Sequence, residues 1–121
     1  MMRRAAYDKG VKAEERVAHD LNELGWDILA RNWRGGRGEL DVVASKDGHL
    51  QFVEVKARKT LGSGLEAVTR AKRLRLVSAG QAWLAQYDEP IRDVSFSLAI
   101  VLDVDGHCQV EWVYDFFDEN E

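Results

Sequence analysis

Residues 38–56, GELDVVASKDGHLQFVEVK, decide the fold because two strand-like runs lie on either side of a tight turn. Both runs are rich in β-branched residues, and the dipeptide Asp47-Gly48 between them is typical of a two-residue hairpin loop. If Asp47 and Gly48 form that loop, Lys46 faces His49 and the pairing of every later residue is fixed. A one-residue bulge would change this register and send opposed side chains to different faces.

The two-residue loop places four charged residues on one face of the hairpin. Asp41 falls opposite Glu54 and Glu39 falls opposite Lys56, because side chains two positions apart along a strand share a face. The other face, which we expect to enter the core, carries Leu40, Val42, Val53 and Val55. Two opposed carboxylates repel each other and destabilise a hairpin. A divalent cation, Mg²⁺ or Mn²⁺, would remove that repulsion, so the register predicts a metal site at Asp41 and Glu54.

A metal at this position suits the hydrolysis of phosphodiester bonds. The cation polarises a phosphoryl oxygen and lowers the pKa of the attacking water. Lys56 is a compact cation that can steer this water or offset negative charge on phosphorus. Glu39 either binds a second metal or forms an ion pair with Lys56, and the ion pair is the simpler interpretation. Glu14 approaches the site if the first helix packs across the edge of the sheet.

Length and composition indicate one globular domain. The chain has 121 residues, of which 45% are hydrophobic and 31% charged. Its only cysteine, Cys108, excludes an internal disulfide and fits a reducing compartment. We find no signal peptide and no apolar run long enough to span a membrane, so we expect a cytoplasmic protein.

Charge is divided unevenly along the chain. Residues 1–75 contain 16 Lys and Arg against 11 Asp and Glu, whereas residues 76–121 contain 1 against 10. This division predicts a basic working surface and an acidic remainder, although solvated faces could produce the same pattern. The candidate phosphate-binding residues are Arg34 and Arg37 in a glycine-rich turn, Arg58 after the hairpin, and Arg70, Lys72 and Arg73 on the exposed side of a helix.

The remaining periodicity predicts the order α-β-β-β-α-β-β, an α/β domain with a central mixed sheet flanked by helices. The expected elements are a helix over 7–25, a strand over 26–33, a turn over 32–38, a mobile loop over 57–64, a helix over 65–86, strands over 94–102 and 109–114, a turn over 103–106, and a frayed acidic tail over 115–121. In the first strand Trp26, Ile28 and Ala30 should share a face. His19 should pair with Glu15, one helical turn away. The loop over 57–64 either closes over the polar face or serves as a plain connector.

Asp41 followed by Glu54-Val55-Lys56 is the pattern of the PD-(D/E)xK nucleases, which alone is short and common. The motifs GELD at 38–41 and FVEVKAR at 52–58 are more specific. Over residues 9–85 the chain resembles the YraN-like family of small bacterial proteins, which are distantly similar to archaeal Holliday-junction resolvases. The resemblance also rests on Lys9-Gly10, Glu14, Gly25-Trp26, Ile28-Leu29, Arg31-Asn32-Trp33 and Lys72, and it departs from the family at Ala13, where glycine is usual.

The resemblance implies a restriction-endonuclease-like single domain with Asp41, Glu54 and Lys56 as the catalytic set and Glu14 as an accessory acid. It implies a Mg²⁺- or Mn²⁺-dependent endonuclease acting on DNA, including branched or damaged DNA, and, by analogy with the resolvases, a homodimer. Two alternatives stay open: a nucleic-acid-binding module that retains the fold without catalysis, and a protein-interaction domain whose metal is structural. The sequence does not decide between DNA and RNA.

Overall fold

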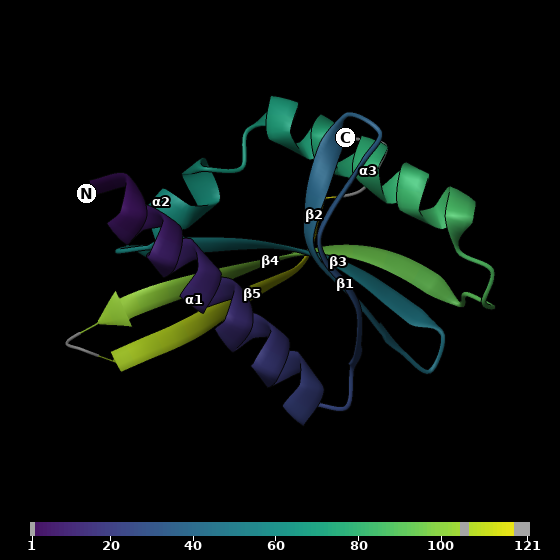
Figure 1. Cartoon of the computed structure of the whole chain (residues 1–121), viewed down its shortest axis with the longest axis horizontal. Helices are drawn as coiled ribbons and strands as arrows, with labels where there is room; N and C mark the ends of the chain where they lie inside the picture. The colour runs from purple at the N-terminus through teal and green to yellow at the C-terminus, as the bar shows by residue number, and fades with distance from the viewer. Residues whose placement is uncertain (1, 105–106, 118–121) are drawn as a thin grey trace.

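A mixed β-sheet with helices on both faces forms the body of the protein (Figure 1). The computed structural model describes residues 2–104 and 107–117, and within these residues the sheet has five strands in the spatial order β1-β2-β3-β4-β5. The helices are α1 (Met2–Glu23), α2 (Leu61–Glu66) and α3 (Arg70–Gln86). The strands are β1 (Asp27–Gly35), β2 (Gly38–Lys46), β3 (His49–Arg58), β4 (Asp93–Val104) and β5 (His107–Phe117). The α/β class and the mixed sheet are therefore as predicted.

Strand β3 lies at the centre of the sheet because of how the chain connects the strands. Strands β1, β2 and β3 form an antiparallel meander, and β5 is antiparallel to β4. Strands β3 and β4 are parallel, from His49–Asp93 to Arg58–Leu102. A parallel pair needs a crossover connection, which α2 and α3 supply. Side chains in the middle of β3 are consequently covered on both sides of the strand.

The β2–β3 hairpin has the predicted register. Lys46 pairs with His49, and the pairing continues in step as far as Val42 and Val53. Asp47 and Gly48 both have positive φ, 51° and 84°, which the favoured two-residue hairpin turn requires. The turn chemistry read from the sequence therefore sets the pairing.

Two hydrophobic cores lie on the two faces of the sheet. The core beneath α3 includes Leu40, Val43, Phe52, Leu76, Trp83, Leu98 and Ile100. The core beneath α1 includes Val17, Leu21, Val42, Val53, Val55 and Ala99. The prediction that Leu40 shares a face with Val42, Val53 and Val55 is wrong, because Leu40 packs with the α3 core. The simple alternation along β2 is broken at Asp41.

Strand β1 also departs from simple alternation. Its pairing with β2 shifts by one residue between Ile28 and Ala30, which is the signature of a β-bulge. Trp26 and Ile28 pack against the α1 core, whereas Ala30 packs against the α3 core. The prediction that these three residues share a face is therefore wrong. Farther along β1, Asn32 has φ 51°, a conformation that asparagine tolerates better than most residues.

The segment after β3 is helical, so the mobile loop predicted over 57–64 is wrong. Residues 57 and 58 complete β3, and Thr60 caps α2 by accepting a hydrogen bond from the Ser63 N–H at 3.1 Å. The helix predicted over 65–86 is also divided, since Ala67–Thr69 separates α2 from α3. Gly64 is buried against Ile100, the β4 partner of Lys56, so this segment packs onto the sheet beside Lys56 as a short helix.

The two glycines of α2 provide a matched test of this packing. A Cβ atom added at Gly64 would lie 2.7 Å from Ile100 side-chain atoms, whereas one added at Gly62 would meet nothing within 4 Å. Gly64→Ala should therefore lower the free energy of unfolding by about 1–3 kcal/mol through overpacking. Gly62→Ala should be neutral or slightly stabilising, because alanine favours the helix. Urea denaturation of both variants tests this, and equal stability would contradict the packing of α2 on β4.

The C-terminal strands are longer than predicted. Strand β4 begins at Asp93 and β5 continues to Phe117, so the expected tail over 115–121 starts inside a strand. Residues 118–121 of that tail, and Asp105-Gly106 of the predicted 103–106 turn, lie outside the described residues. No helix in the described part of the chain is both long enough and apolar enough to cross a membrane.

Candidate active site

The Glu54 carboxylate lies at the centre of a charged cluster on β3. The residue is only 2% exposed, because β2 and β4 flank its strand and Lys72 of α3 reaches its carboxylate. Its Oε1 atom is 3.1 Å from Lys56 Nζ and 3.5 Å from Lys72 Nζ. Its Oε2 atom is buried and has no hydrogen-bond partner among the described residues. A buried carboxylate oxygen without a partner is costly, which makes it a natural point of attachment for a cation or a water molecule.

Asp41 lies where the β2–β3 ladder ends. Backbone pairing between β2 and β3 runs as far as Val42 and Val53. Beyond that pair, the Val55 N–H donates to the side chain of Asp41, at 2.8 Å from Oδ2. Burial, followed by the negative charge of Glu54, raises the pKa of Asp41 to about 7, while the hydrogen bond from Val55 opposes the rise. The negative charge of Glu54 therefore acts on Asp41, but the ladder ends before the predicted Asp41–Glu54 pair.

Glu14 reaches the same cluster from α1. Its neighbours Ala13 and Val17 are buried in the α1 core, which turns the half-buried Glu14 toward the charged residues. Burial raises the pKa of Glu14, and the negative charges of Glu39 and Glu54 act in the same direction. A side-chain hydrogen bond from Asn32 and the charge of Arg31 oppose this rise. The structure thus brings Glu14, Asp41, Glu54 and Lys56 together.

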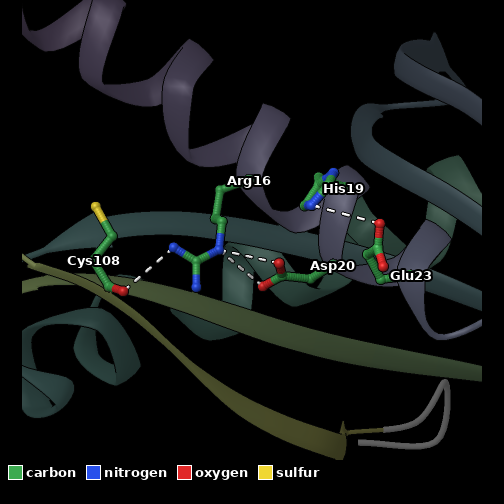
Figure 2. Close-up of polar contacts among 5 residues, drawn as sticks. All are labelled: Arg16, His19, Asp20, Glu23 and Cys108. Carbon is green, nitrogen blue, oxygen red and sulfur yellow. Dashed lines mark hydrogen bonds and ion pairs between the residues drawn. The ribbon is translucent and has the colours of Figure 1, made fainter.

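Arg16 connects α1 to β5, the edge strand of the sheet. Its Nη1 donates to the carbonyl oxygen of Cys108 in β5 at 3.3 Å, and its Nε lies 3.1 Å from the Asp20 carboxylate (Figure 2). These contacts help to set the position of α1, and with it the position of Glu14. His19 pairs with Glu23 at 3.8 Å (Figure 2), so the predicted pair with Glu15 is wrong. The pair is exposed and lies away from the charged cluster.

Glu39 has a different partner from the one expected. Its Oε2 lies 3.5 Å from Arg34 Nε across the β1–β2 pair, where Arg34 and Glu39 face each other. Lys56 pairs with Glu54, so the predicted ion pair between Glu39 and Lys56 is wrong. The Arg34 side chain is 84% exposed, and a pair exposed to this degree contributes little to stability. Glu39 consequently lies at the rim of the cluster.

The donor set fits a hard divalent cation that is only partly held by protein. Among residues 2–104 and 107–117, no group of three or more His, Cys, Asp or Glu side chains could hold a metal ion. Asp41 and Glu54 offer two carboxylates, and Glu54 Oε2 has no other partner among the described atoms. Mg²⁺ commonly binds one or two carboxylates and takes its other ligands from water and substrate phosphates. Such a site needs no third protein ligand.

The predicted nucleic-acid-binding residues fall into two groups. Arg34, Arg37 and Lys72, together with Arg75, line a cleft of about 580 Å³ between the β1–β2 turn and α3. The other three lie outside this cleft: Arg58 donates to the Ala57 carbonyl oxygen at 2.7 Å, Arg70 is exposed, and Arg73 is half-buried. Lys72 was expected on the exposed side of its helix, but its side chain is only 33% exposed and points at Glu54.

Sequence reasoning missed two contributors to the site. Asn32 lies on β1 between the Arg31–Val42 and Trp33–Leu40 pairs, opposite Asp41, and its hydrogen bond reaches Glu14. Ser78 lies on α3 and accepts a hydrogen bond from the Arg37 N–H at 2.9 Å. Ser78 lies one turn beyond Arg75, so helical spacing could have suggested a shared face, but nothing in the sequence indicated a contact with the β1–β2 turn.

Comparison with known proteins supports the resemblance noted from the motifs. The chain is 43% identical over 103 residues to a UPF0102 protein of Nocardia farcinica, covering 84% of this chain and 81% of the relative. It is 47% identical over 88 residues to a UPF0102 protein of Nitrobacter winogradskyi, covering 73% and 75%. A UPF0102 protein of Nitratidesulfovibrio vulgaris is 39% identical over 119 residues, covering 97% and 89%. A family model described as "Uncharacterised protein family UPF0102" matches residues 13–104. The chain therefore belongs to the uncharacterised protein family UPF0102, the YraN-like family.

Proposed function

We propose that this protein is a metal-dependent endonuclease that hydrolyses phosphodiester bonds in DNA, including branched or damaged DNA. One observation carries the proposal: the buried Glu54 carboxylate lies beside Asp41 and forms ion pairs with both Lys56 and Lys72 through a single oxygen. A fold that needed only stability would not gather these charges around one buried acid, because uncompensated repulsion between Asp41 and Glu54 destabilises it. The proposal places the protein in the PD-(D/E)xK nuclease superfamily with a restriction-endonuclease-like fold.

Each residue of the cluster has a role in this proposal. Asp41 and Glu54 would hold Mg²⁺ or Mn²⁺, which when bound would polarise a phosphoryl oxygen and acidify water. Lys56 and Lys72 offset negative charge that develops on the phosphate, since an ammonium group in a partly buried site interacts strongly with an anion. Glu14, whose pKa is raised by burial, is a stronger base than an exposed carboxylate and can accept the proton of the attacking water.

A nucleic-acid-binding module without catalysis is the second candidate. It is supported by the two lysines, whose positive charges offset the negative charge of Glu54. In this alternative the charged cluster positions DNA through Lys56 and Lys72, and the acids keep the lysines in place. The two candidates differ in whether bound DNA is cut.

A panel of DNA substrates separates the two candidates. Purified protein should cut at least one of duplex, single-stranded, flapped and four-way DNA when Mg²⁺ or Mn²⁺ is supplied, and cutting should stop in EDTA. The same panel made of RNA tests the choice of nucleic acid. Binding without cutting across the whole panel in both metals would reject the nuclease and leave the binding module.

A further inference from the structure

The cleft between the β1–β2 turn and α3 is a concave surface with a strongly basic lining. Its lining includes Arg34, Arg37, Lys72 and Arg75, with Glu39 as the only acid. Its volume, about 580 Å³, is within the usual range for ligand pockets. A concave site lined mainly by cations concentrates a positive potential and attracts phosphate groups. The overall charge of the chain is −4, so this concentration is local.

Close packing of the β1–β2 turn on α3 forms this cleft before any ligand binds. A Cβ atom added at Gly36 would lie 2.7 Å from the carbonyl oxygen of Ser78, and one added at Gly38 would overlap the carbonyl oxygen of Arg75. Gly36 also has φ 58°, and the Arg37 N–H donates to Ser78 Oγ at 2.9 Å. The turn is therefore held against the helix, as Figure 1 shows for the end of the β1–β2 hairpin.

Lys72 connects this cleft to the Glu54 cluster. Its Nζ lies 3.5 Å from Glu54 Oε1, and the residue also lines the cleft beside Arg75. Residues 72 and 75 are three positions apart on α3, which places their side chains on neighbouring parts of one helix face. The cleft and the Glu54 cluster are therefore neighbouring sites that share Lys72.

We propose that this cleft, formed by Arg37 and Arg75 with Lys72 at its inner edge, binds a backbone phosphate of DNA next to the phosphate that Lys56 and a metal at Asp41 and Glu54 would hold. This inference rests on the proposed function for the position of the reacting phosphate. It adds Arg75 to the binding residues and assigns Ser78 as a positioning residue, because Ser78 acts through the Arg37 backbone. It also excludes Arg58 and Arg70 from the phosphate site.

The salt dependence of binding tests the inference without requiring any cutting. Binding of a fluorescent DNA duplex in EDTA is measured from low to high salt for the wild type and for Arg37→Ala with Arg75→Ala. Because the cleft is proposed to bind one backbone phosphate, the double variant should lose about 0.9 from the slope of log K against log salt. A control pair with the same charge change, Lys12→Ala with Arg92→Ala, removes exposed cations outside the cleft and should keep the wild-type slope.

An unchanged slope in the Arg37/Arg75 variant, or an equal loss in the control pair, would overturn the phosphate site. Competition by inorganic phosphate at constant ionic strength, together with an unchanged DNA slope, would identify a free-anion site and overturn it too. If cutting is observed, the cleft variant should raise KM with little change in kcat, whereas Lys56→Ala should lower kcat. A lost slope in a protein that never cuts would refute the nuclease proposal and still support the cleft.

Discussion

Glu54→Gln is expected to abolish DNA cutting, with a fall in rate of roughly 10³-fold or more. When catalytic residues act as a unit, removing one of them costs nearly as much activity as removing all of them. The substitution keeps the shape of the side chain and removes the negative charge that faces Lys56 and Lys72 at 3.1 and 3.5 Å. Both lysines are partly exposed, at 19% and 33%, so water can solvate them and the protein should stay folded. Single-turnover cutting of the preferred DNA in Mg²⁺ measures the effect.

Glu66→Gln is the matched control for this experiment. Glu66 is an exposed residue of α2, so the same chemical change there should leave the rate unaltered. Asp41→Ala and Lys56→Ala should also remove cutting while circular dichroism and urea midpoints show folded protein. Cutting by Glu54→Gln at the wild-type rate would show that the buried carboxylate takes no part in the chemistry.

Asp41→Asn is expected to change how stability depends on pH in metal-free buffer. The pKa of Asp41 is raised from 3.8 in the unfolded chain to about 7 in the folded protein. The folded state therefore binds more protons than the unfolded state between these values, and stability falls as pH rises through 7. Between pH 5.5 and 8.0 this carboxyl should cost the wild type about 2 kcal/mol, and the asparagine variant should not lose that amount.

Urea denaturation at the two pH values in EDTA measures this difference. Asp27→Asn, at an exposed position of β1, is the control and should follow the wild type. Adding Mn²⁺ at pH 8.0 should return stability to the wild type and not to Asp41→Asn, because a ligand stabilises only the state that binds it. If the free energy of unfolding changes equally with pH in the wild type and in Asp41→Asn, the pKa of Asp41 is not raised in the folded protein.

The register of the β2–β3 hairpin could be predicted because local chemistry determines it. Asp47-Gly48 permits positive φ at both loop positions, and a two-residue loop fixes all later pairs. The period of a strand then predicts Asp41 opposite Glu54, but the ladder ends one pair earlier, at Val42–Val53, because alternation along β2 is broken at Asp41. The basic character of the segment around Lys72 was equally visible, since charge is a property of the sequence itself.

Other features depend on contacts between distant segments and could not be read from spacing. The shift between Ile28 and Ala30 and the packing of Leu40 reflect the way β1 and β2 bend toward α3. The inward direction of Lys72 depends on where α3 lies over β3, which helical periodicity cannot give. The apparent loop over 57–64 contains two glycines, but Gly64 is there because Ile100 leaves no room for a side chain.

Calorimetric titration of Mn²⁺ tests most directly whether Asp41 and Glu54 form a divalent-cation site. Carboxylate oxygens suit Mn²⁺ as they suit Mg²⁺. Wild-type protein at pH 8.0 should bind Mn²⁺, and Asp41→Asn and Glu54→Gln should each bind it at least about tenfold more weakly, while the exposed controls Asp27→Asn and Glu66→Gln bind as the wild type does. Equal Mn²⁺ affinity in the wild type, Asp41→Asn and Glu54→Gln would contradict the metal site and the nuclease proposal built on it.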